Sequence, residues 1–465
     1  MVRIFRHYVS PIKLALASID FVLLLLCAVG AELFRYFLSD LPLVLSVGWA
    51  AWAAKVLFAG VCLPALLGVG VYQSESLADY RVFWVRLLVG LAATAVVSSA
   101  LLYLFPMLPF WRSILALAII FSGLAILFVR SLFMIFGSPQ ILGRRVLLLG
   151  AGETAENLLK YASDARESGL NIVRTVALSD DNANISNAVK LEDIGSLDQY
   201  VFSNHIEMII VTTDDHKQKL PLEALISCKL AGVEVKDKLA FFEQMRGYVD
   251  VSSVKAEWIV FSDGFRGGSQ IERAAKRLLD LLVSLTFVVA TSPIMVVAGL
   301  LVKLTSRGPV FYLQERVGLD GQEFKLFKFR SMKIDAESSG APQWAQEKDP
   351  RVTVIGGFLR RTRIDELPQI LNVLRGDMSF VGPRPERPFF VKQLGAEIPF
   401  YNERHCVKPG ITGWAQIRYP YGASVEDARR KLEYDLYYIK NYSLFLDLLI
   451  IIQTVRVILF PSGVR

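Results

Sequence analysis

Two adjacent carboxylates in the second half of the sequence follow three arginines. Arg360, Arg361 and Arg363 lead into Asp365 and Glu366. Neighbouring side chains on a helix point about 100° apart, so the two acids suit different tasks rather than one shared atom. One carboxylate can attack a phosphoryl centre while the other binds Mg²⁺, and arginines can neutralise phosphates. The alternative is an exposed helix whose charges pair with one another.

Three further motifs in the same region add basic groups and turns. Basic and aromatic residues interleave around Lys328 and Arg330, a pattern that suits a phosphate held beside lipid headgroups and also suits a solvated surface. Gly382-Pro-Arg-Pro-Glu386 predicts a stiff turn that presents its arginine. Lys408-Pro-Gly-Ile-Thr-Gly-Trp-Ala-Gln416 is the third motif. Together with the acidic pair, they favour a phosphoryl-transfer site over a plain charged surface.

With these motifs in this order behind a Ser-Pro pair, residues 270–465 resemble the bacterial sugar transferases, the monotopic polyprenyl-phosphate hexose-1-phosphate transferases. The resemblance implies that Asp365 is the catalytic nucleophile, which attacks a UDP-sugar at its β-phosphate and releases UMP. Undecaprenyl phosphate then takes the phosphosugar. Glu366 is implied as the Mg²⁺ ligand and second catalytic residue. By the same resemblance, Arg360 and Arg384 match phosphate-binding positions, and Ser292 and Pro293 match the break in the membrane hairpin. We expect Lys328 and Arg330 to be additional phosphate contacts.

The first half of the chain extends the resemblance to long family members, which have four membrane helices and a Rossmann-like domain and initiate exopolysaccharide or O-antigen repeat units. These long members also imply a homodimer. Phe261–Phe265 and Tyr419–Ala423 resemble the branch found with exosortase-linked exopolysaccharide clusters. Arg363 departs from the family, in which small residues are common two positions before the nucleophile. An added phosphate contact and an altered sugar preference both remain open for it.

Four apolar segments in the first 136 residues predict membrane helices. Hydrophobic residues make up 53% of the chain, and the segments lie at about 14–36, 43–72, 87–106 and 113–136. Each can cross a hydrocarbon core of about 30 Å. Basic residues near the segment ends predict that both ends of this bundle face the cytoplasm, at the inner membrane of a bacterium, and further apolar runs argue against a cleaved secretory signal. These basic residues are Arg3, Arg6, Lys13, Arg81, Arg86, Arg144 and Arg145.

The net charge and the positions of the cysteines and histidines favour some classes of binding partner over others. The net charge is +7 and the pI about 9.1. Basic residues gather at predicted membrane edges and near the acidic pair, which favours membrane lipid and phosphorylated substrates over nucleic acid. The four cysteines and four histidines lack ligand spacing, so we expect reduced thiols and no structural metal. Lys55 interrupts the second apolar segment, where a functional role, snorkelling and a position inside the bundle are all open.

Residues 144–262 alternate strand and helix patterns and predict a parallel sheet. Gly150-Ala-Gly152 follows the first strand, where glycines can let a pyrophosphate approach a helix N-terminus. However, Ala155 replaces the third glycine of the dinucleotide motif, and Asp180 and Asp181 lie farther downstream than the usual ribose-binding acid. A nucleotide site and a tight turn in a regulatory or dimerising domain both remain open.

A later apolar run, Leu281–Val302, has basic residues on both sides and Ser292-Pro293 at its centre. Proline removes a backbone donor and bends a helix, and a serine hydroxyl can bond a freed carbonyl. We therefore expect a re-entrant helix at about 277–303 that enters the cytoplasmic leaflet, breaks and returns. A fifth crossing is the alternative, and it would place the following residues outside the cell. Leu444–Phe460 suits an interfacial amphipathic helix or a buried core helix.

The sequence thus predicts a membrane α-helical bundle, an α/β Rossmann-like domain, and an α/β monotopic phosphosugar transferase domain with a re-entrant membrane helix. The expected boundaries are 1–140, 141–266 and 267–465. A membrane-bound nucleotide-sugar dehydratase is the rival enzyme, but no Tyr-x-x-x-Lys pair follows the glycine turn in the middle domain. A non-catalytic regulator of polysaccharide assembly is the rival outside enzymes.

Overall fold

A computed structural model of the chain contains two compact units. The first comprises Met1–Val2 and Val9–Arg246, and the second comprises Arg3–Tyr8 and Gly247–Arg465. The residues that the structure describes are 2–39, 48–73, 76, 79–136, 144–163, 170–178, 185, 188–213, 220–254, 256–262, 264–265, 269–333, 351–419, 422 and 424–460.

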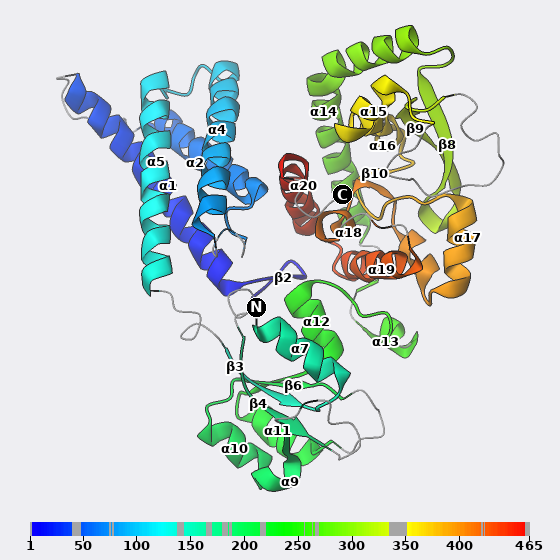
Figure 1. Cartoon of the computed structure of the whole chain (residues 1–465). Coiled ribbons are helices and arrows are strands. Elements are labelled where there is room, and N and C mark those ends of the chain that lie inside the picture. The colour runs from blue at the N-terminus through cyan, green and yellow to red at the C-terminus, as the bar shows by residue number, and fades with distance from the viewer. Residues whose placement is uncertain are drawn as a thin grey trace. The chain divides into compact units, whose positions relative to one another are not determined.

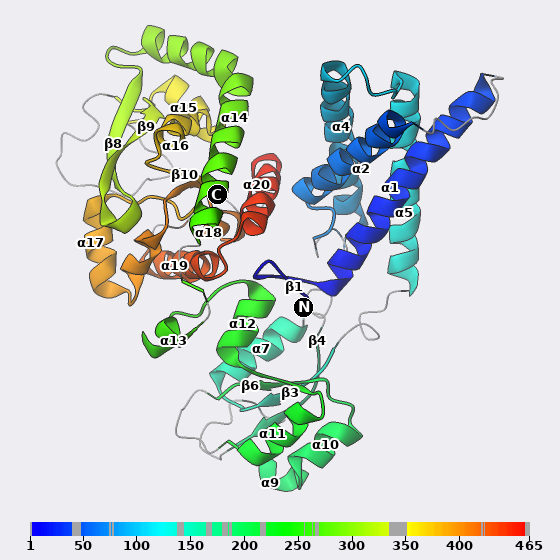
Figure 2. The ribbon, with the colours of Figure 1, turned by 180° about the vertical axis from the view of Figure 1, so that it is seen from behind.

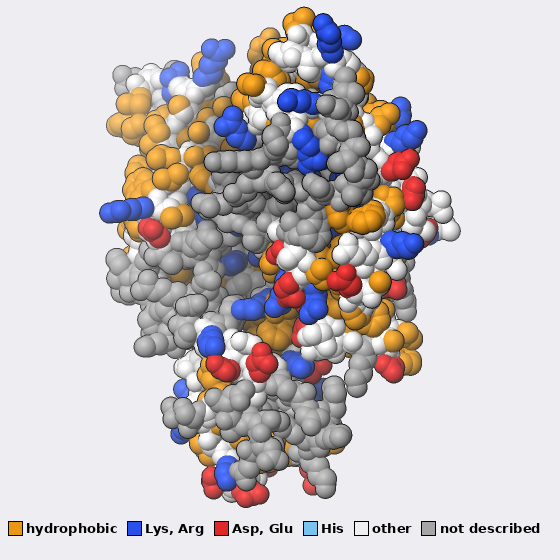
Figure 3. All heavy atoms as spheres, turned by 45° about the vertical axis from the view of Figure 1, so that its right-hand side comes forward, with side chains coloured by type: hydrophobic (Ala, Val, Ile, Leu, Met, Phe, Trp, Pro, Cys, Tyr) orange, Lys and Arg blue, Asp and Glu red, His pale blue; other side chains and the backbone are white. Residues whose placement is uncertain are grey.

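Four long helices open the first unit (Figure 1). They are α1 (Pro11–Leu38), α2 (Trp49–Val69), α4 (Tyr80–Leu104) and α5 (Arg112–Phe136). Each contains a stretch long and apolar enough to cross a membrane, so the four predicted helical segments are confirmed as helices. In the view of Figure 3, hydrophobic side chains, in orange, cover much of the surface formed by this bundle. These features identify a membrane protein.

Buried charges inside the bundle pair with one another. Asp20 lies 2.8 Å from Arg130 and accepts a 2.7 Å hydrogen bond from the Tyr72 hydroxyl. Glu32 lies 2.8 Å from Lys55. Both pairs are almost completely buried, and a charge in an apolar bundle is costly unless it is paired. Of the alternatives for Lys55, the structure therefore shows a position inside the bundle.

The Rossmann-like part of the first unit has a five-stranded sheet in the order β5-β4-β3-β6-β7, and all neighbouring strands are parallel. This confirms the predicted parallel sheet. Its apolar core includes Leu147 of the central strand β3 and Ile209 of the neighbouring strand β6. The elements in chain order are β3 (Arg144–Leu149), α7 (Glu153–Ser163), β4 (Leu170–Ala177), β5 (Val189–Lys190), α9 (Leu191–Ile194), α10 (Leu197–Ser203), β6 (Met208–Val211), α11 (Leu222–Leu230), β7 (Glu234–Asp237) and α12 (Lys238–Arg246).

The glycine turn after β3 has a packing role. Gly150 has φ +123°, and a Cβ there would overlap the backbone and side chain of Thr212. Helix α7 then places Glu153 and Glu156 in its first turn, where acidic side chains repel a phosphate. Both observations favour the tight-turn interpretation of this motif. Asp180 and Asp181 lie outside the described residues.

The second unit combines helices with small two-stranded sheets, and the β1–β2 hairpin is one of them (Figures 1 and 2). β8 and β9 pair antiparallel, and β10 and β11 pair parallel. The elements are β1 (Val2–Ile4), β2 (His7–Val9), α13 (Ala256–Phe261), α14 (Gln270–Thr305), β8 (Phe311–Val317), η2 (Leu319–Gly321), β9 (Glu323–Phe329), α15 (Val354–Arg361), η3 (Ile364–Gln369), α16 (Ile370–Arg375), β10 (Ser379–Val381), α17 (Pro388–Glu397), η4 (Tyr401–Cys406), β11 (Gly410–Thr412), α18 (Trp414–Arg418), α19 (Val425–Lys440) and α20 (Leu444–Leu459). The outermost residues of the β1–β2 hairpin belong to the first unit.

Helix α14 is continuous, so the expected break at Ser292 and Pro293 takes the form of a bend within one helix. Pro293 lies inside it, and the Ser292 hydroxyl donates a 3.0 Å hydrogen bond to the carbonyl of Val289. Figures 1 and 2 show an upright part and a transverse part of the ribbon, and proline is a known cause of such bends. By length and composition α14 is also a candidate membrane helix.

The last helix has two different faces. In α20, Leu446, Asp447 and Ile450 are buried, whereas apolar residues such as Val455 and Ile458 are exposed. The structure therefore combines features of both interpretations of this segment, because one face packs in the core and the other leaves apolar surface uncovered.

Candidate active site

The acidic pair lies on a short 3-10 helix between two α-helices. Helix α15 begins at Thr353, whose hydroxyl accepts a bond from the amide of Gly356, and it ends at Arg361. Arg363 then adopts a left-handed conformation with φ 59°. This turns the chain into η3, which carries Asp365 and Glu366. An apolar cluster that joins α14, β9 and α15 packs against Ile364 at the start of η3, so the site rests on the second half of the bent helix.

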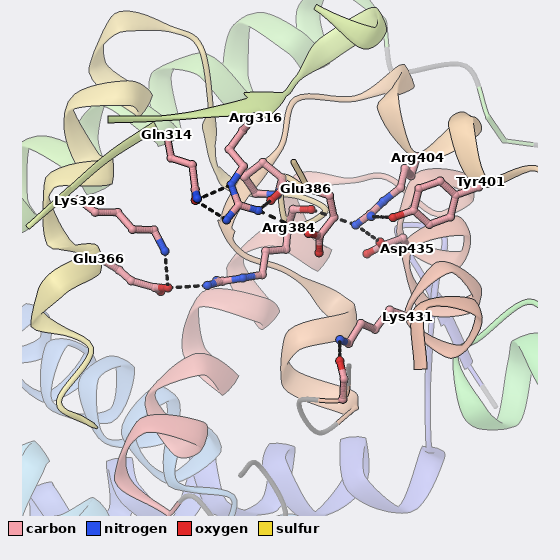
Figure 4. Close-up of polar contacts among 12 residues, drawn as sticks. Gln314, Arg316, Lys328, Glu366, Arg384, Glu386, Tyr401, Arg404, Lys431 and Asp435 are labelled. Atoms are coloured by element: carbon pink, nitrogen blue, oxygen red, sulfur yellow. Dashed lines mark hydrogen bonds and ion pairs between the residues drawn. The ribbon is translucent and has the colours of Figure 1, made fainter. Parts of the chain in front are cut away.

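Glu366 is the centre of a group of cations (Figure 4). Its Oε1 pairs with the guanidinium of Arg384 and lies 3.4 Å from Nζ of Lys328. Arg363 approaches the other oxygen at 3.9 Å. Burial by itself raises the pKa of Glu366, but the charges of Arg384 and Lys328 outweigh burial and hold this pKa well below its usual range. Glu366 is therefore an ionised carboxylate near neutral pH.

Asp365 has the opposite electrostatic environment. Its side chain is buried, with 7% of the residue exposed. Burial and then the negative charge of Glu366 raise its pKa, while Lys328, Arg360 and Arg384 oppose the rise. Among the described residues, no side chain donates a hydrogen bond to this carboxylate. The structure thus presents a carboxylate that is more basic than usual and uncommitted to a described neighbour, which suits a nucleophile.

The other predicted phosphate-binding residues occupy different surroundings. Arg360 influences Asp365 electrostatically and donates a 3.1 Å hydrogen bond to the Ser331 hydroxyl. Arg330 is buried and donates bonds of 2.8 and 2.7 Å to the carbonyl and hydroxyl of Ser306, where α14 ends. The structure therefore brings Lys328, Arg384 and Arg360 around the acidic pair but ties Arg330 to the end of α14.

The loop that carries Arg384 is fixed on both sides. The β10–β11 pairing continues beyond the strands, because the amide of Gly382 donates to Thr412 and that of Gly410 donates to Pro383, each at 2.9 Å. Arg316 donates to the carbonyl of Pro385 at 2.9 Å. These bonds hold the Gly382–Glu386 turn in one conformation, which directs its arginine toward Glu366.

Sequence reasoning missed Arg404, which holds the same loop from the other side. It donates a 3.0 Å hydrogen bond to the carbonyl of Arg384, and it pairs with Asp435 and the Tyr401 hydroxyl at 2.8 Å each (Figure 4). In the sequence it stands between Glu403 and His405, a run that is typical of a charged surface. The local sequence does not indicate this role, since only Tyr401 is nearby, whereas Arg384 and Asp435 are 20 and 31 residues away.

Charged residues at the start of α14 are also part of the core of the second unit. Lys276 is buried and donates to Asp447 of α20 at 2.7 Å and to the carbonyl of Val381 at 3.0 Å. Asp280 accepts bonds from the hydroxyl of Ser379 and the amide of Phe380, each at 2.9 Å. In the sequence Lys276 is one of the basic residues that precede the apolar run Leu281–Val302, and the structure adds that its charge is paired inside the protein.

The donor set at the acidic pair suits Mg²⁺ bound together with a substrate. In the described part of the chain, no group of three or more His, Cys, Asp or Glu side chains could hold a metal ion. Mg²⁺ commonly takes one or two carboxylates and completes its shell with phosphates and water. Glu366 fits that role because it is ionised, and Asp365 is the adjacent carboxylate.

The chain combines apolar helices that are long enough to cross a membrane with a site in which two carboxylates lie among arginines and a lysine. This combination is typical of membrane proteins that bind phosphoryl groups. Residues 271–461 match the family model described as bacterial sugar transferase. Together with the relatives below, this match shows that the chain belongs to the bacterial sugar transferase family.

Three curated relatives illustrate the range of similarity. The UDP-N-acetylgalactosamine-undecaprenyl-phosphate N-acetylgalactosaminephosphotransferase of Aeromonas hydrophila is 45% identical over 241 residues, 52% of this chain and 56% of the relative. Two UDP-glucose:undecaprenyl-phosphate glucose-1-phosphate transferases also match. That of Xanthomonas campestris is 34% identical over 68% of this chain and 66% of the relative, and that of Caulobacter vibrioides is 41% identical over 41% and 73%. The chain spans about half the length of the first relative.

Proposed function

We propose that this protein transfers a sugar 1-phosphate from a UDP-sugar to undecaprenyl phosphate, which yields undecaprenyl-diphosphate-sugar and UMP. The names of the three relatives support this reaction. The observation that carries it is the contrast within the acidic pair, in which Glu366 is held ionised by cations while Asp365 is a buried carboxylate of raised pKa. The product would initiate an exopolysaccharide or O-antigen repeat unit.

In the first step, a carboxylate oxygen of Asp365 attacks the β-phosphorus of the UDP-sugar. An oxygen–phosphorus bond forms and the bond to the bridging oxygen breaks, so UMP leaves with the electron pair. In the second step, a phosphate oxygen of undecaprenyl phosphate attacks the same phosphorus and Asp365 is released as a carboxylate. Two displacements at one phosphorus therefore return the enzyme unchanged.

The basic side chains around the acidic pair would neutralise the phosphates of the substrate together with a Mg²⁺ ion. Glu366 would hold the ion, which when bound withdraws charge from the phosphoryl oxygens. Lys328 and Arg384 lie on either side of Glu366, so the same cations are within reach of a diphosphate bound beside it. Arg360 lies near Asp365 and compensates charge on the attacked group.

The acceptor explains why such a site would lie at a membrane surface. Its lipid tail stays in the bilayer while its phosphate meets a soluble nucleotide sugar. We propose that the second unit (Arg3–Tyr8 and Gly247–Arg465), which carries the acidic pair, is the catalytic unit. We also propose that α14 is re-entrant and that this catalytic unit faces the cytoplasm of the bacterial inner membrane. The bend in α14 supports this, as do the exposed apolar side chains along it, for example Leu285, Val289 and Val296.

The test is product analysis with purified full-length protein, Mg²⁺, undecaprenyl phosphate and either UDP-glucose or UDP-N-acetylgalactosamine. We expect UMP and not UDP as the nucleotide product. When undecaprenyl phosphate is omitted, UMP release should stop at about one equivalent per enzyme, because the phosphosugar stays on Asp365. UDP as the product would indicate ordinary glycosyl transfer and would contradict the proposal.

Replacing the nucleophile tests its assignment. Asp365→Asn should lower UMP release by at least about a thousandfold, because an amide cannot form the phosphoryl bond. Asp320→Asn is the matched control, since Asp320 is exposed in the turn between β8 and β9 and has φ 51°, a conformation that asparagine also tolerates. An Asp365→Asn protein with the wild-type rate would remove Asp365 from the mechanism.

A further inference from the structure

The amino-terminal hairpin is part of the catalytic unit although it precedes the membrane bundle in sequence. Strands β1 and β2 pair with each other, and residues Arg3–Tyr8 belong to the second unit. The turn between them consists of Phe5 and Arg6 with φ 44° and 70°. Two successive residues with positive φ form the tight turn that suits a twisted hairpin, but this conformation is strained for residues other than glycine and persists only where the surroundings impose it.

His7 is the residue of this hairpin that enters the catalytic unit. It is 5% exposed, and its Nδ1 lies 2.9 Å from the hydroxyl of Tyr437. Its ring forms a T-shaped contact with the ring of Trp414, with centroids 5.3 Å apart and planes at 81°. Trp414 in turn stacks on Tyr437 at 5.7 Å. Burial lowers the pKa of His7 to about 4, so near neutral pH an uncharged imidazole completes a cluster of three rings.

Trp414 also receives the chain segment that leaves the Rossmann-like domain. Its indole Nε1 donates a 2.7 Å hydrogen bond to the carbonyl of Gly247. A side chain at Gly247 would meet the indole ring at 3.0 Å, and the φ of +69° also favours glycine there. The chain passes between the two units at three places, after Val2, after Tyr8 and before Gly247. The last two of these connections adjoin or include a residue in contact with Trp414.

Trp414 is joined to the acidic pair by backbone packing. Gly413, the preceding residue, lies so close to the carbonyl of Gly382 that any Cβ would overlap it. The amide of Gly382 donates to Thr412 at 2.9 Å, and Arg384 follows two residues later and pairs with Glu366. A displacement of the indole moves Gly413 and therefore the loop that presents Arg384, because closely packed backbone segments cannot move independently of one another.

We propose that His7 is a positioning residue for the phosphosugar transfer, which makes the amino-terminal hairpin a working part of the active site. It holds Trp414 from one side, so that the contact between Gly413 and Gly382 sets Arg384 against Glu366. The effect on rate rests on the proposed function, whereas the effect on the structure of the Arg384 loop does not. The catalytic unit is accordingly incomplete without residues that lie before the first membrane helix.

Hydrogen exchange and kinetics on the full-length protein test this assignment together. His7→Leu removes the hydrogen bond and the aromatic edge while keeping apolar volume. We expect amide exchange in residues 379–386 and 410–418 to become about tenfold faster, because local opening of the paired loops becomes easier. With both substrates, kcat should fall about tenfold while KM stays within about twofold, since a small displacement of Arg384 impairs the transition state more than binding.

Three further variants separate positioning from a general loss of fold. Tyr437→Phe removes only the hydroxyl and should produce the same changes to a smaller extent. His7→Asn places an amide near the position of Nδ1 and should recover kcat to within about threefold of wild type. Leu230→Ala, which changes a residue of α11 that is 85% exposed and lies outside the hairpin and the second unit, should leave exchange in both segments and kcat unchanged.

Two outcomes would overturn the inference. One is unchanged exchange in both segments of the His7→Leu protein, and the other is faster exchange with an unchanged kcat. If the wild-type protein releases no UMP, the proposed function fails, and the exchange measurements still decide whether His7 holds the Arg384 loop.

Discussion

Asp365 and Glu366 are neighbours in sequence, yet their surroundings shift their pKa values in opposite directions. Glu366 is directed at Arg384 and Lys328, whereas Asp365 is buried beside the charge of Glu366. Successive residues of a 3-10 helix point about 120° apart, so one short helix can give two carboxylates separate environments. One acid thus remains ionised and binds cations while the other gains basicity.

The raised pKa of Asp365 predicts a specific pH dependence. Attack needs the ionised carboxylate, so activity should be lost as the pH falls through this raised pKa, at a higher pH than for an ordinary aspartate. Arg360 opposes the rise. Arg360→Met should therefore raise the pKa of Asp365 further and move the acid limb of the kcat/KM profile to higher pH.

Arg361→Met is the control for this profile. Arg361 is on the same helix, is exposed, and its Nε donates to the carbonyl of Gly357 within α15. Its removal should leave the acid limb in place. A limb that moves to lower pH in the Arg360→Met protein would refute the assigned electrostatics.

Among the elements, α15 depends on close backbone contact at one of two adjacent glycines. A Cβ at Gly356 would overlap the backbone carbonyl of Ser331, whereas a Cβ at Gly357 would meet only the Val352 side chain at 3.9 Å. The contact at Gly356 matters for the site, because Ser331 also accepts the hydrogen bond from Arg360. Because Gly356 has no side chain, helix α15 can pack directly against the backbone of Ser331, just after β9.

The two glycines form a matched pair for a stability test. Gly356→Ala should destabilise the protein by about 1–3 kcal/mol, because the packed backbones must separate. Gly357→Ala should stabilise it by up to about 1 kcal/mol, because alanine favours the helix. Thermal unfolding in detergent measures both, and equal melting temperatures for the two variants would show that the contact with Ser331 is not tight.

For the whole molecule, a re-entrant α14 predicts that both ends of this helix lie on the cytoplasmic side of the membrane. Gln270 and Arg307 are exposed polar residues at its two ends. In a protein whose four native cysteines are replaced, Gln270→Cys and Arg307→Cys should both react with an impermeant thiol reagent from the cytoplasmic side. A re-entrant helix returns to the face that it entered, so both ends lie on one side.

Inverted and right-side-out vesicles provide the two arms of that experiment. Labelling of the two positions from opposite sides would establish a fifth crossing and would contradict a cytoplasmic active site. The basic flanks do not settle this question, because the charges of Lys276 and Arg277 are bound inside the catalytic unit. Their contribution to membrane topology by the positive-inside rule is correspondingly smaller.

The sequence by itself determined the local features of this protein. Hydropathy and strand–helix alternation predicted the four helices and the parallel sheet, since residue periodicity reports local structure. The motifs around Asp365 and Glu366 identified the family, which the comparisons confirmed. The roles of the individual site residues are still predictions.

Only the tertiary structure decided which charges and rings support that site. Arg404, Lys276 and His7 stand in segments that suggest a charged surface, a membrane edge and a terminal tail. Each has a partner outside its own segment, 31 residues away for Arg404 with Asp435, 171 for Lys276 with Asp447 and 430 for His7 with Tyr437. The residues that flank a polar side chain in the sequence do not predict such a partner, because burial and pairing of the group arise only when distant elements pack together.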